Sequence, residues 1–506
     1  MKRILMRSGK SPFHAATTAE YLHQDLMGTN TGNLLFSDSA HKMLTTPNAE
    51  VTSNGIRTNP SAERAAQINE QYDAFVVPLA NAFRPQFQAS LDRLSTLIEQ
   101  LTIPVVVFGV GAQVGAEYDT GVLDPMKDSV KRFARAVLDR SATMGVRGEL
   151  TADYLNGLGF KDVDIIGCPS MFLYGDTFPA LRKPGTFGPE TRIALNLSPN
   201  ARPVGDIAGL AARTAERFPR LMYFAQNMVD AELLYWGDTS AESGYVDDFP
   251  LQLSHDLFRE GKVTVPLDPK TWLEDLAEYD FAFGTRIHGN VAALLAGTPA
   301  VVLTHDSRTL ELCRYFDIPH RMFRGLPVDT DPATLYEEAD FGPMYAGHAE
   351  RFARMTAFLT RNDLENAYEH GDGGTAFEAR MKSLELPPSV RLWDGADDGD
   401  LRYRFARLRE QIAANREAAG KRIDGLAKKN EALTKKLGTA ERTNKTQASA
   451  IAALEKRLAA TEKRLAATDK KVTGIDKRLL VRVGPAVRRR LGAGGKKQPN
   501  KTSGDS

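Results

Sequence analysis

Short apolar runs alternate with helical patterns over about the first 340 residues of the chain. In the N-terminal part these runs are rich in Val and Ile; they are Ala74–Val77, Pro104–Phe108, Thr143–Val146 and Val163–Ile166. Because they lack polar alternation, they predict strands buried on both faces, as in a parallel sheet. The patterns between them predict helices at Ser90–Gln100, Asp128–Arg140 and Glu149–Leu158. This order of strands and helices indicates a doubly wound α/β lobe.

A Pro- and Gly-rich segment, residues 178–189, interrupts this rhythm and predicts a domain boundary. The rhythm then resumes, with strands expected at Arg192–Leu197, Arg220–Phe224, Val263–Pro266, Asp280–Phe283 and Ala300–Leu303, and helices at Pro269–Ala277 and Asn290–Ala296. We therefore predict two Rossmann-like lobes, at residues 1–185 and 186–345. Two such lobes bind ligands in the cleft between them, at the carboxyl ends of the strands.

The C-terminal part carries a different pattern, because heptad positions continue without a break from Phe405 to Leu479. Apolar residues at a and d, with charged residues around them, predict a coiled coil over residues 401–482. Asn430 and Asn444 both fall at a, where Asn fixes the register and favours two strands. A homo-oligomer is therefore expected. One alternative is a single solvated helix. Another is a coiled coil with a different protein as the partner.

Two further segments complete the predicted organisation. Residues 346–400 are expected to form a helical return segment followed by a linker rich in Pro, Asp and Gly. Residues 483–506 contain Arg488, Arg489 and Arg490 in a Gly-rich, charged context, which predicts a disordered basic tail. Such a tail is either simply solvated or a peripheral contact with anionic lipid headgroups.

Composition narrows the class of protein. The chain has 506 residues, of which 42% are hydrophobic and 25% charged, and its net charge is +1. The charge balance gives no reason to expect nucleic acid as a partner. Two cysteines, Cys168 and Cys313, lie in neither a zinc nor a redox spacing, which favours a reducing compartment. No apolar stretch is long enough for a signal peptide or a spanning helix, so we expect a cytoplasmic protein, at most peripheral at the inner membrane face.

Candidate chemistry gathers between residues 280 and 300. An apolar strand ends in Gly284, a turn carries Arg286 and His288, and a small-residue helix follows. The N-terminus of that helix favours an anion, and Gly284 and Gly289 allow the backbone to approach a ligand closely. Arg286 can bind phosphate or carboxylate with two parallel hydrogen bonds, and His288 is a candidate general acid. The competing interpretation is an arginine in a salt bridge and a histidine that caps the helix.

At these residues the sequence resembles the polysaccharide pyruvyl transferase family. The resemblance rests on Arg286–Gly289 as an Arg-x-His-Gly element and on Ala296–Pro299 as Ala-Gly-x-Pro, with weaker matches at Asn30–Asn33, Gly109–Gln113, Val146–Gly159 and Gly167–Ser170. Two departures lie in the N-terminal lobe. Asn33 stands where the family has Asp, and Pro78–Asn81 replaces a Gly-Gly-Gly turn.

The resemblance implies a fold like that of two-lobed glycosyltransferases of the GT-B type. It also implies transfer of the enolpyruvyl unit of phosphoenolpyruvate to a saccharide acceptor, often as a ketal. Arg286 would hold the phosphate or carboxylate, and His288 would protonate the methylene carbon. The substrate-binding candidates are Gly284, Thr285, Gly289, Asn290, Gly109, Gly111, Arg147, Asn33 and Arg308. No metal or cofactor is expected beside the donor substrate.

Two other functions remain open at this point. A glycosyltransferase that uses a nucleotide sugar would share the two lobes and would release a nucleotide instead of phosphate. A non-catalytic scaffold would work through its coiled coil, and the departure at Asn33 gives that interpretation some support. The intact pair Arg286 and His288 favours an enzyme.

Overall fold

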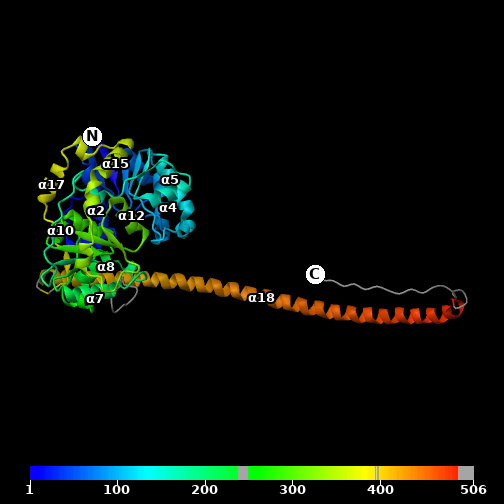
Figure 1. The fold of residues 1–506 in the computed structure, drawn as a ribbon. Helices are drawn as coiled ribbons and strands as arrows, with labels where there is room; N and C mark the ends of the chain where they lie inside the picture. The colour runs from blue at the N-terminus through cyan, green and yellow to red at the C-terminus, as the bar shows by residue number, and fades with distance from the viewer. Residues whose placement is uncertain (238–248, 394, 396–397, 488–506) are drawn as a thin grey trace, which may run out of the picture. The chain divides into compact units, whose positions relative to one another are not determined.

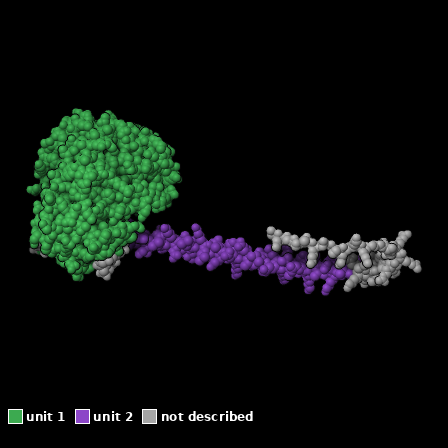
Figure 2. All heavy atoms as spheres, viewed as in Figure 1, with its two compact units in different colours: residues 1–404 green, residues 405–506 purple. Residues whose placement is uncertain are grey.

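The computed structural model describes residues 1–237, 249–393, 395 and 398–487. The chain forms two compact units, Met1–Arg404 and Phe405–Ser506 (Figure 2). The first unit contains the β-sheets, with helices packed around them (Figure 1). Residues 405–487 of the second unit are part of one long helix, α18 (Asp398–Val487).

The first sheet has strand order β2-β1-β3-β4 and is parallel throughout. Its strands are β1 (Lys2–Met6), β2 (Ala49–Ser53), β3 (Ala74–Pro78) and β4 (Val105–Phe108). A parallel bridge between Val110 and Val146 continues it to the pair β5 (Met144–Val146) and β6 (Val163–Ile165). Ile4 of β1 lies in register with Val51 on one side and Ala74 on the other.

The second sheet has seven strands in the order β12-β11-β10-β7-β8-β9-β13. They are β7 (Ile193–Asn196), β8 (Met222–Phe224), β9 (Val263–Val265), β10 (Phe281–Gly284), β11 (Ala300–Thr304), β12 (His320–Met322) and β13 (Val390–Arg391). All pairs are parallel except β13 with β9. In register, Phe283 of β10 pairs with Leu195 and Val301.

Both sheets contain a point where the strand order reverses. In the second sheet the first six strands have the order of the Rossmann fold, and the reversal lies between β7 and β10. In the first sheet the reversal lies between β1 and β3, as in flavodoxin-like folds. Open α/β sheets bind ligands outside the carboxyl ends of the strands at such points. We therefore expect a ligand site among the residues that follow β1, β3, β7 and β10.

The helices of the first unit cover these sheets. They are α1 (Thr18–Gln24), α2 (Gly32–Leu44), α3 (Ala62–Gln71), α4 (Gln88–Glu99), α5 (Lys127–Leu138), α6 (Glu149–Gly157), α7 (Ile207–Arg217), α8 (Met228–Trp236), α9 (Asp256–Arg259), α10 (Pro269–Leu276), α11 (Ile287–Leu295), α12 (Ser307–Phe316), α13 (Pro332–Glu337), α14 (Gly342–Ala346), α15 (His348–Arg361), α16 (Ala367–His370) and α17 (Thr375–Lys382). Helix α5 shows why such segments fold, because Val130, Phe133, Ala134 and Val137 form one buried stripe at helical spacing.

One apolar core joins the two sheets. It contains Val76 of the first sheet, Leu35 of α2, Ala282 of the second sheet and Leu294 of α11, all almost fully buried. Helix α15 returns to the first sheet, where Phe358 contacts Phe108 edge to face with ring centroids 5.7 Å apart. Both sheets therefore belong to one compact unit, Met1–Arg404.

The predicted strands and helices agree with the structure to within one or two residues at most ends, except at the helix expected to begin at Asn290. The differences lie at β1, β2, β12 and β13, which the sequence patterns did not predict. The expected linker at Pro387–Asp400 contains β13, because Val390 and Arg391 pair with Val265 and Thr264 at the edge of the second sheet. Helix α11 begins at Ile287, three residues before Asn290, because the turn after Gly284 enters the helix at once.

Helix α18 also departs from the predicted limits. It begins at Asp398 and continues through Gly484 and Pro485 to Val487, whereas the basic tail was expected to begin at residue 483. Glycine and proline disfavour a helical backbone without prohibiting it at the end of a long helix. The rest of the predicted tail, residues 488–506, lies outside the described residues. Over the part of the chain that the structure describes, no helix has both the length and the hydrophobicity needed to cross a bilayer.

Candidate active site

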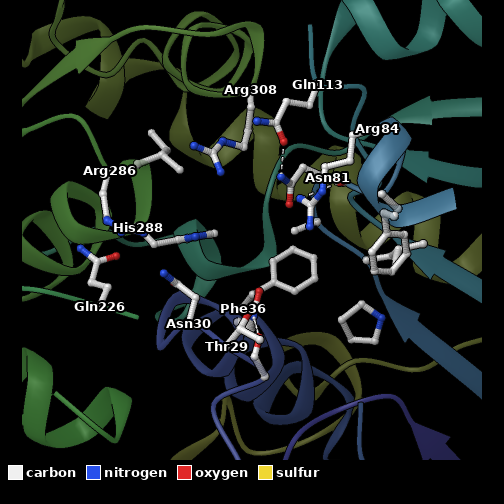
Figure 3. Close-up of a pocket in the computed structure, with 18 of the residues that line it drawn as sticks. Thr29, Asn30, Phe36, Asn81, Arg84, Gln113, Gln226, Arg286, His288 and Arg308 are labelled. Carbon is white, nitrogen blue, oxygen red and sulfur yellow. Dashed lines mark hydrogen bonds between the residues drawn. The ribbon is translucent and has the colours of Figure 1, made fainter. Parts of the chain in front are cut away.

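A cleft of about 870 Å³ opens where the two strand-order reversals face each other. Figure 3 shows Arg286, His288 and Gln226 on the side of the second sheet, and Asn81 and Arg84 on the side of the first. Among the described residues its lining holds five arginines and two aspartates; they are Arg7, Arg84, Arg147, Arg286 and Arg308, and Asp25 and Asp306. Low-dielectric walls lined by one sign of charge concentrate ligands of the opposite sign. The cleft is therefore suited to an anion.

The turn between β10 and α11 is fixed by the end of the neighbouring strand β7. Gly284 has a φ of +146°, and a Cβ there would lie 1.8 Å from the carbonyl oxygen of Asn196, so only glycine fits. The Asn196 side chain accepts a 2.9 Å hydrogen bond from the backbone N–H of Arg286. Its amide nitrogen donates to Asn290 Oδ1 at 3.0 Å. Asn196 therefore ties the two strands together at the reversal point.

The side chain of Arg286 is held by the backbone that follows β7. Its Nε donates to the carbonyl oxygen of Leu197 at 2.6 Å, which orients the guanidinium toward the cleft. The nearby Asp230 carboxylate is buried behind it, and the pKa of Asp230 is raised by that burial although the Arg286 charge opposes the shift. Arg286 thus keeps nitrogen atoms available for a ligand while one donor is used for positioning.

His288, the second residue of α11, faces the cleft. It lies close to Cys168 and Gly32, which come from the N-terminal part of the chain. Its Nε2 lies 3.4 Å from the Sγ of Cys168. On its other side a Cβ placed on Gly32 would lie 2.8 Å from Nδ1. Burial, together with the charges of Arg147 and Arg308, lowers the pKa of His288 to about 3. Without a ligand the imidazole is therefore neutral at physiological pH.

Arg147 is fully buried and lines the inner end of the cleft. It follows β5, and its backbone N–H donates to the carbonyl oxygen of Val110 at 3.0 Å. The Nε and Nη2 atoms have no hydrogen-bond partner among the residues that the structure describes. Because arginine stays charged in proteins and an unpaired buried charge is costly, these atoms are ready donors for a bound anion.

Arg308 lies within electrostatic reach of most other cations of the cleft. Its charge contributes to lowering the pKa values of Arg84, Arg147, Arg286, His288 and His305. It is the second residue of α12, and its Nη2 lies 3.4 Å from Asp306, the residue that caps this helix. Its buried Nε has no partner within the described part of the chain. Three arginines and His288 thus converge on one region of the cleft.

Two cationic residues of the lining were not predicted from the sequence. Arg7 directly follows β1, and burial lowers its pKa to about 10. Arg84 follows β3; its Nη1 donates to the carbonyl oxygen of Asn81 at 3.1 Å, and the guanidinium lies 5.6 Å from the ring centre of Phe87. Only the positions of these two arginines could have indicated their role, because they follow β1 and β3, the strands that flank the reversal point of the first sheet. Gln226 was also missed, and its buried Nε2 has no partner in the described structure.

Of the substrate-binding residues predicted from the sequence, Arg147, Asn33 and Arg308 line the cleft together with Arg286 and His288. The other six are not part of the lining but lie behind it: Gly284, Thr285, Gly289, Asn290, Gly109 and Gly111. They shape the backbone. Thr285 Oγ1 accepts from the backbone N–H of Ser198, and the Asn290 amide donates to two carbonyl oxygens of its own turn.

The glycines of the first sheet have the same supporting role. Gly109 has a φ of +64°, and a Cβ there would meet the carbonyl oxygen of Gly167 at 2.8 Å. At Gly111 a Cβ would lie 3.1 Å from the Arg147 side chain, so this glycine leaves room for the buried guanidinium. Asn33 lines the cleft, but its amide donates to the carbonyl oxygen of Gly28 at 2.7 Å and closes the preceding loop.

His305 also lines the cleft, beside Asp306. Two tryptophans, Trp272 and Trp236, are buried. No group of three or more His, Cys, Asp or Glu side chains in the described ranges has the arrangement of a metal site.

The sequence model of the polysaccharide pyruvyl transferase family matches residues 30–307, which is more than half of the chain and includes most of the cleft. No curated protein matches the sequence. Among solved structures, a UDP-GlcNAc 2-epimerase of Methanocaldococcus jannaschii is 10% identical, covers 76% of this chain and 99% of its own, and has a TM-score of 0.36. The Neisseria meningitidis UDP-GlcNAc 2-epimerase is 9% identical, covers 76% and 100%, and has a TM-score of 0.34. On the family match, this chain is a transferase that belongs to the polysaccharide pyruvyl transferase family.

Proposed function

We propose that this enzyme transfers the pyruvyl group of phosphoenolpyruvate to hydroxyl groups of a saccharide. The observation that carries the proposal is that Arg147 and Arg308 line the same cleft as Arg286 and that each has guanidinium nitrogens without a hydrogen-bond partner among the described residues. Phosphoenolpyruvate has a phosphate and a carboxylate on adjacent positions of one small molecule. It therefore needs several cationic donors in close proximity, which this region of the cleft supplies.

In this proposal Arg147, Arg286 and Arg308 bind the two anionic groups of the donor. Arginine suits this task because its planar fork donates two parallel hydrogen bonds to carboxylate or phosphate oxygens. The desolvated nitrogens of Arg147 and Arg308 gain the most from binding, because they lack partners in the empty cleft. Gln226, with a buried and unpartnered amide nitrogen, supplies a further donor at the same wall.

His288 acts as the general acid. In the empty cleft its pKa is lowered to about 3 by burial and by the neighbouring arginines, so the ring is neutral. A bound phosphate and carboxylate offset those positive charges and raise the pKa of His288, and the ring then takes up a proton. His288 gives this proton to the methylene carbon of the donor, the central carbon becomes electrophilic, and an acceptor hydroxyl attacks it. Phosphate leaves with the electron pair of its C–O bond, and a second hydroxyl of the saccharide attacks the resulting oxocarbenium carbon to close the ketal. Of the two hydroxyl protons released, one restores His288 and the other leaves with the phosphate.

The saccharide acceptor is assigned to the side of the cleft formed by the first sheet. Asn30, Asn81, Gln113 and Arg84 line this side with amide and guanidinium groups, and Phe87 supplies an aromatic face. Neutral hydrogen-bonding groups around an aromatic ring are the usual means of binding sugar hydroxyls and the apolar face of the ring. The segment Pro78–Asn81, which departs from the family's glycine turn, lies in this wall and therefore bears on which acceptor fits.

The test is acceptor-dependent release of inorganic phosphate from phosphoenolpyruvate across a panel of oligosaccharides and lipid-linked or nucleotide-linked sugars. Wild type, His288→Gln and Arg308→Gln are compared with Arg132→Gln, a control that removes an exposed arginine paired with Glu99. Release by wild type and by the control, lost in the other two variants, supports the assignment. Failure of phosphoenolpyruvate to bind at all, with release of nucleotide from a nucleotide sugar, would replace it by glycosyl transfer.

A further inference from the structure

Helix α18 carries a row of apolar side chains that no other described residue of its own unit covers. In the described stretch the row consists of Ile423, Leu426, Leu433, Leu437, Ile451, Leu454, Leu458, Leu465, Val472 and Ile475, each more than half exposed. These residues occupy the a and d positions of the heptads that continue through the helix. A continuous apolar seam of this length on a solvated helix marks an interaction surface. The charges beside the seam identify what binds there.

The positions on the two sides of the seam carry opposite charges. At position g the described helix has basic residues, which are Arg422, Lys429, Lys436, Arg457, Arg464 and Lys471. At position e it has acidic residues, which are Glu441, Glu455, Glu462 and Asp469. No acidic residue occurs at g and no basic residue at e over residues 420–475. One edge of the seam is therefore positive and the other negative.

This separation of charge selects a parallel arrangement of two identical helices. In a parallel coiled coil, position g of one helix lies beside position e of the next heptad of the other helix. That rule places Lys436 beside Glu441, Arg457 beside Glu462 and Arg464 beside Asp469 of the second copy, and each pair occurs twice by symmetry. In an antiparallel coil g faces g and e faces e, so the same residues would bring like charges together.

The register is set by two polar residues in the seam. Asn430 and Asn444 occupy a positions two heptads apart. In register, each Asn meets the same Asn of the second helix and the two amides can hydrogen-bond to each other. A shift of one heptad would place Asn430 against Leu437 or Ile423 and leave buried amides without partners, which is costly. The electrostatic pairs alone tolerate such a shift, so the two Asn residues supply the register.

We propose that residues 423–475 form a parallel, in-register, two-stranded coiled coil with a second copy of this chain. The coiled coil itself does not depend on the reaction at the active site. Its consequence for the substrate rests on the proposed function: a parallel coil attaches both transferase units of the dimer to the same end of the coil, so that one saccharide chain can meet two active sites. This gives the second active site a high effective concentration along the same substrate.

Disulfide cross-linking of the full-length protein tests orientation and register. Ala440→Cys and Thr461→Cys each place a thiol at position d, three heptads apart, and Ala460→Cys places one on the outer face as the control. The native Cys168 and Cys313 are buried and do not compete. We expect covalent dimers from both d variants separately and none from the control. Cross-linking at only one of the two positions, or at neither, overturns the parallel in-register arrangement.

Reciprocal charge reversal tests the partner. Arg457→Glu with Arg464→Glu makes both edges acidic, and Glu462→Lys with Asp469→Lys makes both basic. We expect the Kd for dimerisation of each double variant to rise by up to about tenfold over that of wild type. An equimolar mixture of the two variants should recover a stable heterodimer by analytical ultracentrifugation. Lys456→Glu with Lys463→Glu, at the outer f positions, is the matched control and should stay dimeric. A monomeric wild-type protein at micromolar concentration, or a mixture that does not associate, would disprove self-association through this seam.

Discussion

The imidazole of His288 lies directly against the backbone of Gly32, so that a Cβ on Gly32 would be 2.8 Å from Nδ1 and 2.9 Å from the histidine Cβ. Gly32 is the first residue of α2, and His288 is the second residue of α11. The contact joins α2, the second helix after β1, to α11, the helix that follows β10. The absence of a side chain at residue 32 therefore decides where the proposed general acid sits.

We predict that Gly32→Ala lowers kcat about 100-fold, because a displacement of the imidazole by about 1 Å has a cost of that order. The melting temperature should change little, because alanine is favoured over glycine in a helix and this offsets part of the steric strain. Gly157→Ala is the control, since Gly157 is also helical and a Cβ there meets no atom within 4 Å. Equal activity of Gly32→Ala and wild type would show that the position of His288 is not critical.

A second prediction concerns Arg147, whose buried Nε and Nη2 lack partners in the described structure. Arg147→Met keeps about the same length of side chain and removes the buried guanidinium with its unpartnered Nε and Nη2. We expect the empty protein to become more stable, by about 1–3 kcal/mol, because an unsatisfied buried polar group has a cost of this size. We also expect the Kd for phosphoenolpyruvate, measured by calorimetry, to rise at least about tenfold, because a charged hydrogen-bond donor is lost.

The control for this prediction is Arg140→Met, an arginine whose three hydrogen bonds to backbone carbonyls are structural. It should lower stability without changing the affinity for phosphoenolpyruvate. If Arg147→Met instead destabilises the empty protein and leaves affinity unchanged, Arg147 is a structural residue, and the anion site must be assigned to Arg286 and Arg308 alone.

Most of the strands that the sequence predicted are buried on both faces, such as β4, whose four residues are all apolar and fully buried. The missed strands lack this signal. Strand β12 has only Met322 as an apolar residue and is exposed for most of its length. Only its pairing with β11, and no pattern in the sequence, identifies it as a strand. Strand β1 begins with two basic residues, which concealed its apolar end.

Missing β1 also concealed part of the site. Arg7 follows β1 directly, and a known strand there would have placed Arg7 at the same sheet edge as the segment after β3. Arg286 and His288 were accessible to sequence reasoning because glycine, arginine and histidine meet within five residues. Gln226 and Arg84 had no such local signal, because only the order of the strands brings them to the cleft.

A third prediction follows from the low pKa of His288. If donor binding raises that pKa from about 3 toward neutrality, binding takes up a proton. Since the complex then holds more protons than the free enzyme, affinity falls as pH rises, by up to about tenfold per pH unit. Calorimetry at pH 6.5 in buffers of different ionisation enthalpy measures the uptake directly.

The His288→Gln variant isolates the contribution of this residue from proton exchange on the substrate phosphate, which both proteins share. His23→Gln, an exposed residue of α1, is the control and should behave as wild type. Equal proton uptake by wild type and His288→Gln would mean that His288 stays neutral in the complex, and the proton of the reaction would then need another source.

The last prediction concerns a buried carboxyl group beneath the cleft. Asp38 of α2 is buried, both of its carboxylate oxygens lack hydrogen-bond partners in the described structure, and its pKa is raised to about 8 by burial and by the charge of Asp268, against the influence of Lys10. Lys10 itself is paired with Asp268 at 2.9 Å, and Tyr21 donates to the same carboxylate.

Because the native state holds the Asp38 proton more tightly than the unfolded chain, the contribution of Asp38 to stability is full below the unfolded pKa of about 4 and is lost as pH rises toward 8. Asp38→Asn cannot ionise. As pH rises from about 5 to about 8, we therefore expect wild type to lose stability relative to Asp38→Asn, by on the order of 1 kcal/mol of unfolding free energy per pH unit. Denaturant unfolding at three pH values measures the difference. Asp153→Asn, at an exposed position of α6, is the control and should run parallel to wild type. A constant difference between Asp38→Asn and wild type across this range would show that Asp38 is ionised in the native protein and that Lys10 neutralises both carboxylates.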